Sequence, residues 1–291
     1  MSIAESLKGR VKDLLPDAMF LSLSHRRKVG RFPNVEHPLT FNEKILHRCL
    51  HPDPCFAHFA DKLLVRDYVT RTIGDAYLIP LLATPEPFTR ADFDALPRSF
   101  VMKVNHASNF VKIVRDKSET TFEELHALAA HWLSTNFYRI ARERHYKGIR
   151  PRLFFEQLLL DEHGDVPADI KVHCFTERTG KKKAYIMRVS DRFTPRPCGD
   201  FFDEHWNLLD IAVAGFFTSP TPAPRPDNLG QILATAKALA ADFDYVRVDL
   251  YALGDRIYFG ELTFTPGAGV DRLYPDKVDY DWGRLFHTCS S

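Results

Sequence analysis

The sequence predicts an α+β fold with antiparallel sheets. Two observations support this prediction: strand-like and helix-like segments are mixed without a strict βαβ alternation, and the last two strands are separated only by a short turn. With 45% hydrophobic residues among 291, the chain can bury a sizeable core, in one large domain or in two lobes.

Periodicity predicts the individual helices and strands. The helix at 121–138 has the clearest signals, because Thr120 and Glu123 have the spacing of a capping box and apolar residues follow on one side. The proline-rich stretch 218–228 must be an irregular connection. The other helices are expected at 42–50, 61–72 and 228–241, and the strands at 76–82, 100–105, 110–115, 152–159, 169–176, 183–189, 245–251 and 257–263.

Composition and charge narrow the class of protein. A formal net charge of +1 creates no overall field that would attract nucleic acid, so no nucleic-acid partner is expected. The five cysteines are odd in number and form no C-x-x-C pair, which indicates reduced thiols and a cytoplasmic location. The sequence contains no apolar run of about 18 residues, the length needed to span a membrane, and no signal-peptide pattern at its start.

The N-terminal segment from Ile3 to Leu23 has apolar residues at helical spacing and ends in the basic run His25–Arg31. Two interpretations stay open for this segment. It is either a helix that lies on the inner membrane surface, in peripheral contact with lipid, or a helix docked on the protein body.

The last predicted strand pair carries unexpected charges. Side chains alternate between the two faces of a strand, so Arg247 and Asp249 share one face of the first strand. Glu261 and Thr263 share one face of the second strand. A three-residue loop, 254–256, would place Asp249 opposite Glu261 and Arg247 opposite Thr263.

Two carboxylates directly opposite each other repel, because their Cβ atoms lie about 5 Å apart. Arg247 could offset that repulsion as a structural ion pair. A divalent cation would offset it better, and Mg²⁺ typically takes one or two carboxylates plus the phosphates of a substrate. Spacing alone leaves a magnesium site and a solvated face equally open. The glycines of the next segment, Thr265–Gly269, form either an anion-binding backbone or an ordinary turn.

Several motifs resemble a known family. The pattern R-x-D, followed twelve residues later by E-x-T-x-x-P-G, resembles the end of the ATP-grasp fold. Together with FNEKI, DKLLVRDYV, LPRSFVMKVNHAS and PRLFFEQLL in this order, it resembles the TupA-like ATP-grasp family of polysaccharide biosynthesis, from about residue 40 to the C-terminus. The resemblance implies an N-terminal helical segment, 1–60, and an ATP-grasp domain, 61–291. Two lobes, at about 61–155 and 156–291, would clasp ATP.

The resemblance also implies roles for the residues that match the family motifs. Lys62 and Lys103 would hold the ATP phosphates, and Lys183 or Arg188 would add a phosphate contact. Glu156, Gln157 and Leu158 of the hinge strand would hold adenine, Asp169 would contact the ribose, and Lys171 would be a further cofactor-binding residue.

The hairpin residues would supply the rest of the site. Asp249, Glu261 and Thr263 would bind Mg²⁺, with Thr263 standing where the family usually has Asn. Arg247 and the backbone N–H of Gly267 would stabilise an oxyanion during the reaction.

The implied activity is that of an ATP-dependent carboxylate–amine ligase working through an acyl phosphate. The implied partners are a uronic-acid carboxylate of a surface glycan and an amino acid or related amine. An ATP-grasp phosphotransferase acting on a glycan precursor and a non-catalytic nucleotide-binding protein are the alternatives.

Overall fold

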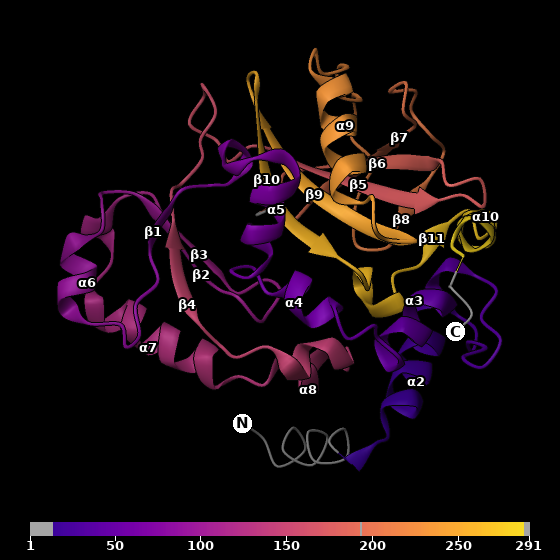
Figure 1. Cartoon of the computed structure of the whole chain (residues 1–291), viewed down its shortest axis with the longest axis horizontal. Coiled ribbons are helices and arrows are strands. Elements are labelled where there is room, and N and C mark those ends of the chain that lie inside the picture. Colours follow the sequence, from indigo (N-terminus) through magenta and orange to yellow (C-terminus); the bar gives the residue numbers. More distant parts are fainter. Residues whose placement is uncertain (1–13, 193, 288–291) are drawn as a thin grey trace.

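The computed structural model describes residues 14–192 and 194–287, and it has two main antiparallel sheets (Figure 1). The four-stranded sheet has the order β1 (Leu81–Ala83), β4 (Leu153–Glu156), β2 (Phe100–Val104) and β3 (Val111–Val114). The five-stranded sheet has the order β10 (Arg256–Thr263), β9 (Tyr245–Leu253), β5 (Asp169–Thr176), β6 (Lys182–Ser190) and β7 (Cys198–Phe202). A small pair joins β11 (Leu273–Tyr274) to β8 (Ala212–Val213). The α+β architecture with antiparallel sheets is therefore confirmed.

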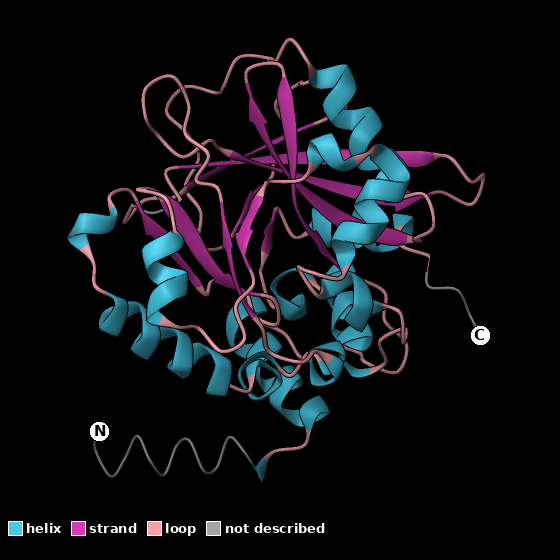
Figure 2. Cartoon of the chain, turned by 60° about the vertical axis from the view of Figure 1, so that its left-hand side comes forward, coloured by secondary structure: helices cyan, strands magenta, loops and turns pink. Residues whose placement is uncertain are grey.

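Helices cover the outer faces of both sheets, as Figures 1 and 2 show. The four-stranded sheet is flanked by α6 (Arg90–Ala95) and α7 (Phe122–Ser134), and the five-stranded sheet by α5 (Val65–Ile73) and α9 (Leu229–Leu239). The remaining helices are α2 (Asp17–Val29), α3 (Phe41–Leu50), α4 (Phe56–Ala60), α8 (Phe137–Ala141) and α10 (Lys277–Leu285), with short 3₁₀ turns η1 (Asp75–Tyr77), η2 (Lys117–Glu119), η3 (Arg144–Gly148) and η4 (Pro266–Gly269).

Each sheet buries its own apolar residues. Phe100 and Phe155 of the four-stranded sheet pack with Trp132 of α7. One face of the five-stranded sheet packs on α5 and α9 through Val172, Val248 and their neighbours. Part of the other face packs on α3 and α10, through the residues Phe41, Phe175, Tyr245 and Trp282. The helices of the N-terminal segment thus share a core with the C-terminal part of the chain.

Two predicted helices begin or end elsewhere. The helix expected at 61–72 starts only at Val65, because the Asp61 carboxylate accepts the backbone N–H groups of Leu63 and Leu64 and holds a turn there. Lys62 therefore lies in a turn and not on a helix. The helix expected at 121–138 divides into α7 and α8, and its capping box is formed by Thr121 and Glu124, one residue further along the chain than predicted.

Strand boundaries also differ at two places. The strand expected at 76–82 is a 3₁₀ turn followed by the short strand β1 at Leu81–Ala83. The strand expected at 152–159 is regular only over β4, Leu153–Glu156, after which the chain leaves the sheet.

The β9–β10 hairpin has the predicted pairing but a different loop. Asp249 lies opposite Glu261 and Arg247 opposite Thr263, as expected. The three-residue loop is wrong: Leu253 pairs directly with Arg256, which leaves two residues in the turn, and the register shifts between Phe259 and Glu261. A bulge at Gly260 restores the predicted pairing, and glycine allows it because a Cβ there would lie 3.0 Å from the carbonyl oxygen of Asp249.

The bulge also changes which side chains of β10 face the core. Strict alternation of side chains along β10 would put Phe259 on the same face as Glu261, and Leu262 on the other face. In the structure Phe259 and Leu262 are both buried in one core, 5% and 3% exposed. The extra residue lets the apolar half of β10 face α5 and α9 while Glu261 faces the other way.

Candidate functional site

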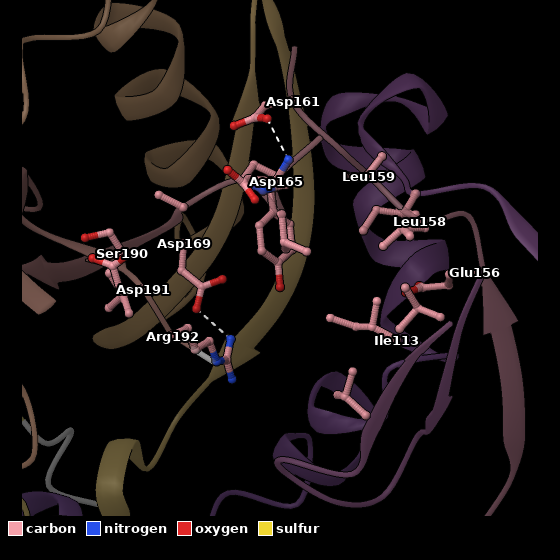
Figure 3. Close-up of a pocket in the computed structure, with 18 of the residues that line it drawn as sticks. Ile113, Glu156, Leu158, Leu159, Asp161, Asp165, Asp169, Ser190, Asp191 and Arg192 are labelled. Carbon is pink, nitrogen blue, oxygen red and sulfur yellow. Dashed lines mark hydrogen bonds and ion pairs between the residues drawn. The ribbon is translucent and has the colours of Figure 1, made fainter. Parts of the chain in front are cut away.

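A cavity of about 410 Å³ lies between the two sheets; we call it the inter-sheet cavity (Figure 3). One wall comes from β2, β3 and the chain after β4, and includes Ile113, Leu158 and Leu159. The other wall comes from β5, β6 and the residues that follow β6, including Asp169 and Arg192. An apolar slot with charged groups at one side suits a flat base attached to an anionic group.

Lys103 and Glu156 meet in this cavity. Lys103 and Glu156 lie on the neighbouring strands β2 and β4, two residues apart in register, and Lys103 Nζ lies 2.7 Å from Glu156 Oε2. Arg66 of α5 is 3.7 Å from the other carboxylate oxygen. Both predicted residues line the cavity, and so do Gln157 and Leu158. The backbone N–H of Gln157 donates to Pro80 and is therefore already used.

The structure separates the two candidates for a further phosphate contact. Arg188 on β6 lines the inter-sheet cavity. Lys183 is five residues earlier on the same strand, places its ammonium over the Tyr185 ring at 5.4 Å, and does not line the cavity. Because residues five apart on a strand point to opposite faces, Arg188 is the better placed of the two.

A second cavity, of about 690 Å³, lies against the hairpin; we call it the charged cavity. The two cavities share Asp169, Val189 and Arg192 in their walls, so they adjoin. The charged cavity brings together the predicted residues Lys171, Arg247, Glu261, Thr263 and Gly267.

Buried ion pairs organise the strand face beside the charged cavity. Asp249 accepts from Arg247 Nε at 2.6 Å, from Arg247 Nη2 at 2.7 Å and from Lys171 Nζ at 2.6 Å. Asp169 lies 3.3 Å from Lys171 and 2.5 Å from Arg192, the latter contact being drawn in Figure 3. The sequence allows two ways to offset the repulsion between Asp249 and Glu261, an ion pair with Arg247 and a bound divalent cation. The structure shows the ion pair.

Glu261 is the more accessible of the two hairpin carboxylates. Its side chain is 30% exposed, against 7% for Asp249, and it lies 3.3 Å from Lys62 and 3.5 Å from Arg247. Burial by itself would raise the pKa of Glu261, but Lys62, Arg247, Lys171 and Arg192 together hold that pKa below its ordinary value. The carboxylate is therefore charged at neutral pH and faces the cavity.

The donor set fits magnesium chemically. The Glu261 carboxylate and the Thr263 hydroxyl are hard oxygen donors that line the charged cavity. The third predicted donor, Asp249, lines neither cavity, and both of its oxygens accept from Arg247 or Lys171. Within residues 14–192 and 194–287 no cluster of three or more His, Cys, Asp or Glu forms a closed metal site. A cation held here would have to share its coordination with a ligand, which is how Mg²⁺ is usually bound beside phosphates.

Lys62 connects the hairpin to the loop after β2. Its ammonium donates to the carbonyl of Ala107 at 3.0 Å and lies near Glu261. That loop contains no glycine, yet Asn109 adopts a left-handed φ of 64° and Asn105 is anchored by Asp61 at 2.7 Å. Asparagine is the non-glycine residue that best tolerates this conformation, so the loop makes its turn without glycine.

Gly267 sits in the turn that follows β10. Its φ of 57° and the Asp271 carboxylate, which would be 2.0 Å from a Cβ at this position, both favour glycine. The Gly267 backbone lines the charged cavity, as the predicted anion-binding role needs, and that role stays a prediction.

Two residues of the site were missed by sequence reasoning. Arg192 lines both cavities but lies in an irregular loop, where no periodicity marks it. Glu143 is 8% exposed and lines the charged cavity, although it comes from the highly charged stretch 139–147. Sequence patterns do not distinguish one buried carboxylate among so many charged neighbours.

The chain is similar to known proteins in both sequence and fold. A family model described as TupA-like ATPgrasp matches residues 44–287. No curated protein matches the sequence. Among solved structures, D-alanine–D-alanine ligase from Helicobacter pylori is similar at 12% identity and a TM-score of 0.43, over 79% of this chain and 61% of that one.

Two other solved structures show similarity of the same degree. D-alanine–D-alanine ligase from Bacillus anthracis complexed with ATP has 18% identity and a TM-score of 0.40, over 72% of this chain and 56% of that one. N5-carboxyaminoimidazole ribonucleotide synthetase from Thermus thermophilus has 15% identity and a TM-score of 0.41, over 85% of this chain and 52% of that one. The chain thus spans between half and two thirds of these proteins.

Proposed function

The chain belongs to the TupA-like ATPgrasp family, and on that premise we propose that it is an ATP-dependent ligase that joins an amine to a carboxylate. In this proposal the carboxylate belongs to a uronic acid of a surface polysaccharide or its precursor. The amine belongs to an amino acid or a related compound. The observation that supports the proposal best is that the inter-sheet cavity and the charged cavity adjoin at Asp169, Val189 and Arg192.

The inter-sheet cavity is the proposed ATP site. Adenine would lie against the apolar residues Ile113, Leu158 and Leu159, and Lys103 would meet the phosphates as a point charge. From there the γ-phosphate would reach toward the shared wall of the two cavities. Asp169 and Arg192 would then stand between nucleotide and acceptor.

The reaction has two steps. An oxygen of the acceptor carboxylate attacks the γ-phosphorus, the bond from phosphorus to the bridging oxygen breaks, and ADP leaves with that electron pair. The amine nitrogen then attacks the acyl carbon, the carbon–oxygen bond to phosphate breaks, and the nitrogen loses a proton. The products are an amide, ADP and phosphate.

The cations of the site favour both steps. A carboxylate and a triphosphate repel each other, and Lys62, Lys171 and Arg192 lower the cost of bringing them together. Arg247 and the Gly267 N–H would face the oxyanion of the second step. Loss of one such donor typically costs about 3 kcal/mol of barrier. When bound between Asp249, Glu261 and Thr263, Mg²⁺ would supply additional positive charge to the phosphate oxygens.

A steady-state ADP assay tests the proposal. The purified protein is given ATP and Mg²⁺ with glucuronate or galacturonate, with a panel of amino acids and amines, and with both together. A ligase releases ADP and forms an amide only when acid and amine are both present. ADP release with a single acceptor and a phosphorylated product would instead identify a phosphotransferase. No ADP under any combination, despite nucleotide binding, would identify a nucleotide-binding protein.

The proposed location is the cytoplasm, with contact to the inner membrane surface through α2. ATP is available there, and the four described cysteines are free thiols. Met19 and Leu23 on α2 are 51% and 43% exposed, and Arg26, which lines neither cavity, follows them. An apolar and basic surface of this kind suits an anionic bilayer.

Part of the predicted helix, residues 3–13, lies outside the described residues. Within the described residues no helix combines the length and apolar character needed to cross a membrane.

A further inference from the structure

We propose that Glu143 binds the ammonium group of the amine co-substrate inside the charged cavity, an inference that rests on the proposed ligase function. Nothing in the sequence motifs points to this residue.

Glu143 lies against the segment that carries the proposed oxyanion site. It stands between α8 and η3, and its Oε1 accepts a hydrogen bond from the Thr265 hydroxyl. Thr265 directly precedes Pro266 and Gly267. Glu143, Thr265 and Gly267 all line the charged cavity. An ammonium group held by Glu143 would therefore lie beside the backbone where the acyl carbon is attacked. It would first give one proton to the Glu143 carboxylate, and the neutral amine so formed has the lone pair that attacks.

Within residues 14–192 and 194–287, no cation lies close enough to Glu143 to form an ion pair with it, and Lys62 and Arg247 act on it only from a longer distance. The buried carboxylates Asp169 and Asp249 each contact two cations, whereas Glu143 forms no ion pair with a described residue. A carboxylate that is only 8% exposed is rarely left in this state. The pKa of Glu143 is raised to about 7, mainly by burial and also by the charge of Glu261, although the hydrogen bond from Thr265 and the charges of Lys62 and Arg247 lower it. A cationic ligand would offset both effects.

Aromatic rings near Glu143 add a second attraction for an organic cation. Phe137 and Tyr146 both line the charged cavity, and their ring centroids are 4.8 Å apart in an edge-to-face arrangement. Ring faces attract ammonium groups electrostatically. Elsewhere the cavity is lined by Arg27, Lys28 and Arg247, which suit the acidic acceptor. The cavity thus offers oppositely charged partners to the two substrates of a ligase.

The experiment compares nucleophiles that differ in charge. With a uronate acceptor, an acyl phosphate reacts with hydroxylamine to a hydroxamate, and hydroxylamine is largely uncharged at neutral pH. L-alanine, L-serine and ethanolamine carry an ammonium group at the same pH. If Glu143 recognises that charge, Glu143→Gln raises the KM for the best of these amines by roughly 10- to 100-fold and leaves hydroxamate formation unchanged. The KM for ATP also stays unchanged.

Two further variants control for folding. Asp200→Asn alters another buried carboxylate that forms no ion pair with a described residue, is 3% exposed and does not line either cavity, so it should leave the KM for the amine unchanged. Glu143→Asp keeps the negative charge and should raise that KM less than Glu143→Gln does. Circular dichroism checks that each variant is folded. If Glu143→Gln does not fold, the KM of Glu143→Asp for the amine is the measurement that tests the inference.

Each remaining outcome decides the question. Equal losses with hydroxylamine and with the charged amines would show that Glu143 has only a structural role, and an unchanged KM for the amine would likewise overturn the inference. The same conclusion holds if the wild-type protein forms hydroxamate but accepts none of the charged amines. A wild-type protein that forms neither ADP nor hydroxamate with either uronate would refute the ligase function itself, and this inference with it.

Discussion

Asp249 holds together the charged face of the five-stranded sheet, and its replacement by Asn should destabilise the protein. The side chain is 7% exposed and receives three charge-assisted hydrogen bonds of 2.6 to 2.7 Å, two from Arg247 and one from Lys171. Those two cations are themselves only 15% and 10% exposed. Removing the negative charge leaves both of them buried with weaker partners.

The magnitude follows from what remains. After Asp249→Asn, Arg247 keeps Glu261 at 3.5 Å and Lys171 keeps Asp169 at 3.3 Å, and both distances are long for an ion pair. Breaking a buried pair by removing one partner typically costs about 3–5 kcal/mol. Because Asn preserves one acceptor oxygen, we expect a loss near the lower limit, about 3 kcal/mol of the free energy of unfolding.

Glu261→Gln is the matched comparison, since it removes the facing carboxylate of the same hairpin. The Glu261 side chain is 30% exposed and its cations lie at 3.3 and 3.5 Å, so the loss of stability should be below about 1 kcal/mol. The same change should abolish ADP formation if Glu261 binds Mg²⁺.

Urea denaturation followed by circular dichroism measures both variants against the wild-type protein. Similar losses in the two variants, or a loss below about 1 kcal/mol for Asp249→Asn, would refute the reasoning that burial and short contacts make Asp249 the structural partner. Full ADP formation by folded Glu261→Gln would contradict the metal assignment.

Three other variants test separate parts of the structure. Lys103→Ala should weaken ATP binding roughly 10- to 100-fold in calorimetry because it removes a cation of the inter-sheet cavity, whereas Lys183→Ala, outside that cavity, should not; equal affinities would move the phosphate site elsewhere. Gly267→Ala should lower the free energy of unfolding by at least about 1 kcal/mol, since φ is 57° and the Asp271 carboxylate occupies the space, and an unchanged midpoint in urea would argue against this turn. Burial lowers the pKa of His145 from 6.5 to about 4, so the unfolded chain binds a proton over this interval that the folded chain does not. Stability should therefore fall by about 3 kcal/mol as pH falls from 6.5 to 4, and the urea midpoints of His145→Gln should show a correspondingly smaller dependence on pH; identical pH profiles would exclude His145 as the cause.

Local patterns predicted much of the secondary structure because hydrogen bonding and side-chain alternation depend on near neighbours. The hairpin shows both the strength and the limit of such reasoning. The alternation of side chains along the two strands correctly predicted that Asp249 lies opposite Glu261. The predicted loop length was wrong, because a bulge at Gly260 compensates for a turn that is one residue shorter. Similarly, consecutive threonines and glutamates allowed two capping boxes, and the packing of Leu125 and Trp132 selected Thr121 with Glu124.

The family motifs, read in order, identified the ATP-grasp fold, and most of the site residues that they predicted line one of the two cavities. They did not reveal Arg192 or Glu143, because neither residue lies in a regular strand or in a motif. Burial of one carboxylate within a charged stretch depends on which distant segments pack over it. For Glu143 that segment is 122 residues away, at Thr265.

The sequence by itself determined the α+β class, the strands of the two main sheets other than β7, and the pairing of charges across the hairpin, since these depend largely on contacts between near neighbours. Only the tertiary structure decided which cation meets which acid. Lys171 is 78 residues from Asp249, and Lys62 comes to Glu261 from the other end of the domain. Coulomb interactions depend on distance in space and on burial, and both are set by how the two sheets and their helices pack.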